Sequence, residues 1–118
     1  MLASFLFQIN NSGKFNINEK ILLEQEYIFP RIKKIYNSNY YFIYVAFARG
    51  DFSDYYYEDE RYIFIGDYTF YNSKELYESL GLKTNCSIKI PQIIIMLFNN
   101  YDNEFIKLIE GDFSFLIF

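Results

Sequence analysis

Three runs of aromatic and β-branched residues, at residues 2–9, 39–49 and 113–118, constrain the fold of this chain more than any other feature. Residues 39–49 (NYYFIYVAFAR) contain no glycine or proline, so they predict a central strand, which Gly50 ends. The runs at both ends of the chain predict two further strands. The last run stops without a turn or a charged residue, so we expect its edge to need a partner or more chain.

Helix-forming segments lie between these strands. They span residues 19–25, 73–81, 91–98 and 104–109. Asn72 or Ser73 can cap the second helix, and Gly81 can adopt the left-handed conformation that ends it. A proline in the first turn suits the third helix, and Asn103 can cap the fourth. With a further strand at residues 61–65, the pattern predicts an α+β fold.

Two polar segments are predicted to be turns or loops. Residues 10–13 (NNSG) suit a hairpin turn, and Pro30 should end the helix at residues 19–25. Residues 51–60 carry five acids around three tyrosines and predict a loop between strands. A hard cation is an alternative for this loop, but it lacks the regular alternation and glycine of an EF-hand, so we favour a solvated loop. We assign the tyrosines to the core rather than to a partner surface.

Length and charge limit the classes of function. The 118 residues make one domain, with 52% hydrophobic residues to form its core. The net charge is −4 and the only basic doublet is Lys33-Lys34, so we expect no binding to nucleic acid. Residues 2–9 are too short to span a bilayer, which argues against a membrane protein.

The cysteine and histidine contents restrict the chemistry further. Cys86 is the single cysteine, so no internal disulfide forms, and we predict a cytoplasmic protein. The sequence has no histidine, which excludes Ser-His and Cys-His nucleophile pairs and imidazole metal ligands. Without an adjacent histidine to lower its pKa, Cys86 reads as an inert thiol. We expect no metal, no cofactor and no autonomous catalysis.

Two blocks in the second half of the chain have a specific pattern. Residues 67–72 read DYTFYN, and Leu76 follows at the centre of the helix at residues 73–81. Residues 93–98 read IIIMLF, and residues 104–116 contain Glu-Phe and then IEGDFSFL. In asparagine synthetases the corresponding stretches read Asn-Gly-Glu-Ile-Tyr-Asn, Val-Ile-Leu-Ala-Leu-Tyr and Leu-x-Gly-Met-Phe-Ala-Phe-Ala, at matching intervals. Residues 61–118 therefore resemble the amino-terminal glutamine-amidotransferase domain of that family, whereas the first 60 residues match only in outline.

The resemblance implies a fold and a lost reaction. The family fold is the sandwich of amino-terminal-nucleophile hydrolases, two antiparallel sheets with helices outside, here incomplete at its carboxyl end. The family's nucleophile is an amino-terminal cysteine, whereas position two is Leu2. At the oxyanion turn, Asp67 replaces the asparagine and Tyr68 replaces the glycine. The substrate-binding Gly-Ser-Asp corresponds by spacing to residues 88–90, so the carboxylate that holds the substrate amine is also missing.

One element of the family's binding site has a counterpart. Residues 46–49 (AFAR) resemble the end of the strand whose arginine grips the glutamine carboxylate, so Arg49 either retains that role or is an ordinary solvated arginine. The relic site would consist of Arg49, Asp67 and Tyr68.

The resemblance implies a non-catalytic scaffold or docking domain of an asparagine-synthetase-like, ATP-dependent amide-forming system, such as the lasso-peptide cyclases. Its partner would be a protein or an ATP-dependent synthetase domain, or a second copy in a homo-oligomer. The alternative is a small α+β adaptor that pairs with another protein through its C-terminal strand.

Overall fold

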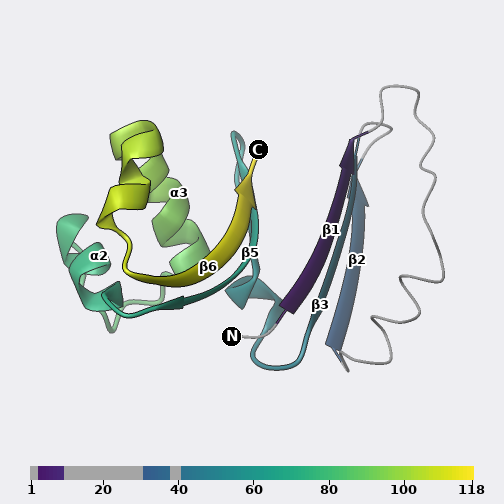
Figure 1. Cartoon of the computed structure of the whole chain (residues 1–118), viewed down its shortest axis with the longest axis horizontal. Helices are drawn as coiled ribbons and strands as arrows, with labels where there is room; N and C mark the ends of the chain where they lie inside the picture. The colour runs from purple at the N-terminus through teal and green to yellow at the C-terminus, as the bar shows by residue number, and fades with distance from the viewer. Residues whose placement is uncertain (1–2, 10–30, 38–40) are drawn as a thin grey trace. The chain divides into compact units, whose positions relative to one another are not determined.

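The computed structural model describes residues 3–9, 31–37 and 41–118, with side chains from Val45 onward except that of Ala46 (Figure 1). The chain divides into two compact units, residues 2–52 and residues 53–118. The hairpin turn expected at residues 10–13 and the helix expected at residues 19–25 lie outside the described residues.

The first unit contains an antiparallel sheet of three strands. They are β1 (Ala3–Ile9), β2 (Arg31–Asn37) and β3 (Tyr41–Phe47). The order is β1-β3-β2, so the aromatic run predicted to be a central strand does lie at the centre. Val45 and Phe47 of β3 are buried, and Gly50 has a φ of 76° in the bend that follows. The strands predicted at residues 2–9 and 39–49 are confirmed.

Strand β2 was not predicted from the sequence. Its residues, RIKKIYN, place two lysines side by side and so break the alternation that indicates a strand. It forms beside β3 through seven consecutive antiparallel pairs, including Ile35 opposite Ile43. Pairing with an existing strand therefore decides the conformation here, and local pattern does not.

The second unit contains another three-stranded antiparallel sheet, of order β4-β5-β6. Its strands are β4 (Tyr56–Glu58), β5 (Ile63–Phe70) and β6 (Gly111–Ile117). A short 3-10 helix, η1 (Phe52–Asp54), precedes β4. Strand β6 confirms the strand predicted at residues 113–118. The prediction that residues 51–60 form only a loop is wrong, because Tyr56–Glu58 pair with the start of β5.

Two α-helices and a 3-10 helix connect β5 to β6. They are α2 (Ser73–Ser79), α3 (Ile90–Tyr101) and η2 (Asp102–Leu108). As predicted, Gly81 is left-handed, with a φ of 71°, after α2, and Pro91 lies in the first turn of α3. Helix α3 continues three residues past the predicted end, and the fourth helix is 3-10 rather than α. Its predicted cap, Asn103, lies inside η2, and Tyr101 holds the N-cap position.

The core of the second unit lies between β5 and its helices, which cover one face of the sheet (Figure 1). Phe64 and Tyr68 of β5 belong to one buried cluster with Leu76 of α2 and Ile94 of α3. Ile65, on the opposite face of β5, is also fully buried, although it is not part of that cluster. Both faces of β5 therefore bury apolar side chains. The combination of antiparallel sheets and helices confirms the α+β class predicted from the sequence.

Strand β5 is longer than the strand predicted at residues 61–65. It continues through Phe70, so most of the turn predicted at residues 67–72 is strand. Gly66 makes this possible, because it lies opposite Phe115 of β6, where an added Cβ would overlap the Cβ of that phenylalanine. A glycine inside a strand commonly marks such a close approach.

Candidate functional site

Asp67 and Tyr68, two of the predicted relic residues, lie in the middle of β5. Asp67 pairs with Ser114 of β6 and Tyr68 pairs with Phe113. Because successive side chains of a strand point to opposite faces, the two neighbours serve different surroundings. Tyr68 faces the helices, whereas Asp67 faces the other side of the sheet.

Tyr68 is a core residue. It is 7% exposed and its ring stacks on that of Phe70, with centroids 5.0 Å apart. Burial, and after it the negative charge of Asp54, raises the pKa of the Tyr68 hydroxyl far above its ordinary value. The phenol therefore stays protonated at neutral pH, and it offers neither a base nor a nucleophile.

Asp67 lies beside a shallow cavity on the face of β5 and β6 away from the helices. The cavity measures about 210 Å³, and the side chains that line it on this face are those of Asp67, Thr69, Asp112 and Ser114. The Asp67 side chain is half-buried, with Oδ1 shielded from solvent. The cavity thus presents two carboxylates and two hydroxyls, a lining suited to cationic groups. In the part of the chain that the structure describes, no group of three or more acidic or cysteine side chains could hold a metal ion.

Arg49 is exposed in the bend that follows β3. It belongs to the unit of residues 2–52, whereas Asp67 and Tyr68 belong to that of residues 53–118. A site that contains all three residues therefore stays a prediction.

A polar clasp that the sequence reading missed joins the start of α2 to the segment before β6. The side-chain Nδ2 of Asn72 donates to the carbonyl oxygen of Leu108 at 2.7 Å, and its Oδ1 accepts from the backbone N–H of Glu110 at 3.0 Å. Tyr71 donates its backbone N–H to the Glu110 carbonyl at 2.7 Å and its hydroxyl to Oδ2 of Asp112 at 2.6 Å. Asn72 holds the N-cap position of α2, as predicted, but its side chain makes no capping bond. The Tyr-Asn pair at residues 71–72 is the sequence signal from which these contacts could have been predicted.

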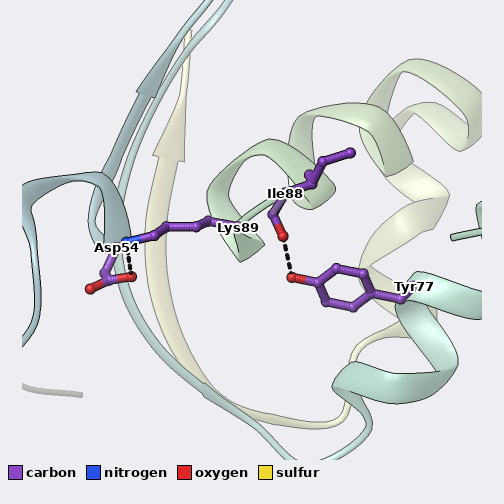
Figure 2. A network of polar contacts seen from close by, with 4 residues as sticks. All are labelled: Asp54, Tyr77, Ile88 and Lys89. Atoms are coloured by element: carbon purple, nitrogen blue, oxygen red, sulfur yellow. Dashed lines mark hydrogen bonds and ion pairs between the residues drawn. The ribbon is translucent and has the colours of Figure 1, made fainter. Parts of the chain in front are cut away.

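Residues 88–90, which the resemblance matches to a substrate-binding stretch, lead into α3, with Lys89 at its N-cap position. Figure 2 shows the Lys89 ammonium reaching the Asp54 carboxylate, with Nζ 3.0 Å from Oδ1. In the same view the Tyr77 hydroxyl donates to the Ile88 carbonyl at 2.6 Å. The ion pair links η1 to the start of α3.

A second cavity, of about 250 Å³, lies beside Lys89. It is lined by residues of η1, β4 and the start of α3: Ser53, Tyr56, Tyr57, Ser87, Lys89, Pro91 and Gln92. The sequence does not predict this cluster, because its members come from separate segments of the chain. Cys86, nearby in the chain, is half-buried against the core cluster, which suits the inert thiol predicted for it.

Comparisons with models of protein families and with curated proteins give no significant match to this chain. Within the described residues, no helix has the length and apolar character needed to cross a membrane.

Proposed function

We propose that this chain is a non-catalytic, amidotransferase-like scaffold or docking domain of an asparagine-synthetase-like, ATP-dependent amide-forming system. The observation that carries the proposal is the position of Asp67 and Tyr68 inside β5. An oxyanion hole needs donors aimed at the developing negative charge. Asp67 offers a carboxylate there instead, and the Tyr68 side chain is committed to the core.

The architecture of each unit supports the family fold. An amino-terminal-nucleophile sandwich requires two antiparallel sheets, each covered by helices on its outer face. Residues 53–118 supply one such sheet with its helical layer, and residues 2–52 supply a second three-stranded antiparallel sheet. Burial on both faces of β5 is also what a sheet inside a layered sandwich requires.

The Asn72 clasp supports the resemblance in a second way. The two blocks on which the resemblance depends are 36 residues apart at the Asn72 to Leu108 bond. A direct hydrogen bond between them explains why a Tyr-Asn pair would recur at this spacing from the terminal strand. Within this proposal, the motif has a structural role that does not depend on catalysis.

The proposal is tested by assaying the purified chain for ammonia release from glutamine, with an active glutaminase as positive control. We expect no release above the rate without protein. Turnover that persists through repurification would overturn the proposal. A parallel assay measures binding to the synthetase-type protein encoded beside or downstream of this chain, recognised by a Ser-Gly-Gly-x-Asp-Ser pyrophosphate loop, and we expect a complex.

A small adaptor that pairs through its C-terminal strand is a second candidate. The observation that favours it is that β6 lies at an edge of its sheet among the residues described. The genomic sequence after Phe118 separates the two candidates. Further strands and a pyrophosphate loop would support the scaffold, whereas a stop codon together with a stable monomer would support the adaptor. Light scattering after size exclusion tests the proposed homo-oligomer, and cytoplasmic location remains part of the proposal.

A further inference from the structure

The backbone of β6 presents hydrogen-bonding groups along its outer edge. Ile63 of β5 and Phe118 exchange both of their backbone hydrogen bonds, at 2.8 and 3.1 Å. Because such pairs alternate along an antiparallel ladder, the register directs the groups of Asp112, Ser114 and Leu116 toward β5. The intervening residues, Gly111, Phe113, Phe115 and Ile117, direct their N–H and C=O groups to the other side. No described strand pairs with that side.

The two faces of this edge differ in chemistry. On the helical face, Phe113 is 38% exposed although its ring stacks on that of Phe115, with centroids 5.2 Å apart. On the opposite face, Asp112 and Ser114 are exposed at the 210 Å³ cavity beside Asp67. A strand added to β6 would therefore place alternate side chains beside Phe113 and Phe115, and the others beside Asp112, Ser114 and Leu116.

The charge of the unit favours a basic partner. Residues 53–118 contain eleven acidic and five basic side chains, a net charge of −6. At the edge itself, Oδ2 of Asp112 accepts from Tyr71, and Oδ1 has no partner among the described residues. That oxygen can accept a hydrogen bond from an ammonium or guanidinium group.

We propose that the outer edge of β6 binds an extended segment of a partner protein in which basic residues alternate with apolar ones. The inference rests on a docking role, which both candidate functions proposed above share, and it names the partner's chemistry. The partner's backbone extends the sheet, its apolar side chains cover Phe113, and its basic side chains face Asp112 and the adjacent cavity. The negative charge at the edge also disfavours the binding of acidic strands.

Three synthetic heptapeptides test the proposal in titrations followed by fluorescence anisotropy. The first alternates lysine and valine, and the second alternates glutamate and valine. The third is the first with all of its backbone amides N-methylated, which blocks strand pairing at both of its edges. We expect the lysine peptide to bind at least about ten-fold more tightly than either of the others, since like charges repel and the ladder bonds are lost. Hydrogen exchange should show slower exchange of the Phe113 and Phe115 amides in the complex.

Matched variants locate the charge effect. Asp112→Asn should lower the affinity for the lysine peptide by about two- to five-fold, the effect expected from loss of an exposed ion pair. Glu75→Gln, which removes another exposed carboxylate, on α2, should leave the affinity for the lysine peptide nearly unchanged. Circular dichroism confirms that both variants are folded.

Each result decides a different point. Equal binding of the lysine and glutamate peptides would overturn the basic partner and leave edge docking intact. Equal binding of the N-methylated peptide would overturn strand pairing. Absence of all peptide binding, together with a stable complex with the synthetase-type protein, would overturn this inference while the proposed function stands. Glutamine turnover would overturn the proposed function alone.

Discussion

Asn72 donates a hydrogen bond from its side-chain Nδ2 to the backbone carbonyl of Leu108, 36 residues further along the chain, at 2.7 Å. The same side chain accepts from the N–H of Glu110. A single amide thus satisfies two backbone groups of the segment that leads into β6. This bond fixes where the last strand begins relative to the end of β5.

Asn72→Ala should therefore destabilise the protein. It removes two hydrogen bonds and leaves a backbone donor and a backbone acceptor to be satisfied by water, so we expect a loss of about 1–2 kcal/mol in the free energy of unfolding. Urea denaturation followed by circular dichroism measures the change. Asn85→Ala is the matched control, because Asn85 is exposed and makes no side-chain bond in the described structure. Equal effects of the two substitutions would contradict the clasp.

Gly66→Ala should also destabilise the protein, because it overpacks the contact between β5 and β6. The added methyl group would overlap the Cβ of Phe115, so β5 and β6 would have to separate, at a cost of about 1–3 kcal/mol. Thermal denaturation measures the effect. At Gly81 an added Cβ meets nothing within 4 Å, so Gly81→Ala should cost only the strain of its left-handed backbone, about 1 kcal/mol. A larger loss at Gly81 would argue against the close approach at Gly66.

The free energy of unfolding should decrease at alkaline pH because of the ionisation of Tyr68. Burial, followed by the charge of Asp54, raises the pKa of Tyr68 above its unfolded value of 10.0, so the folded state holds this proton more tightly. The resulting stabilisation is complete below pH 10 and is lost as the pH rises toward the folded-state pKa. Each such proton contributes a slope of about 1.4 kcal/mol per pH unit.

Denaturation of wild type and Tyr68→Phe at several values above pH 10 measures this slope. The variant should lose stability less steeply than wild type, because it has no phenol to ionise. Tyr71→Phe is the control. The hydrogen bond to Asp112 raises the pKa of Tyr71, but this tyrosine is exposed, so its removal should change the slope less. Parallel curves for wild type and Tyr68→Phe would contradict a buried, protonated Tyr68.

The Lys89 to Asp54 ion pair should contribute modestly. Its side chains are 41% and 20% exposed, so solvent screens much of the attraction. A double-mutant cycle with Lys89→Met and Asp54→Asn should give a coupling energy of about 0.5–1 kcal/mol, smaller at 1 M salt. A coupling near zero at low salt would show that the contact in Figure 2 does not stabilise the fold.

The sequence predicts local structure correctly where neighbouring residues alone determine the conformation. The aromatic run of β3, the proline in the first turn of α3 and the left-handed Gly81 each depend on neighbouring residues only, and each was predicted. The 3-10 geometry of η2 was not, because its residues suit either helix type.

The candidate site shows the opposite limit. The resemblance singled out Asp67 and Tyr68 and implied that they lie in a turn. Pairing of Gly66 with Phe115 instead extends β5 through both residues. The meeting of Asp54 with Lys89 and of Asn72 with Leu108 joins segments distant in the chain, and no local pattern encodes such encounters.

The sequence by itself determined the α+β class, the central strand and the absence of histidine chemistry, because these follow from residue types and short-range periodicity. Only the tertiary structure decided that β2 and β4 are strands and that Tyr68 is a core residue. The physical reason is that strand pairing and burial depend on partners far away in the chain, and these contacts override weak local preferences.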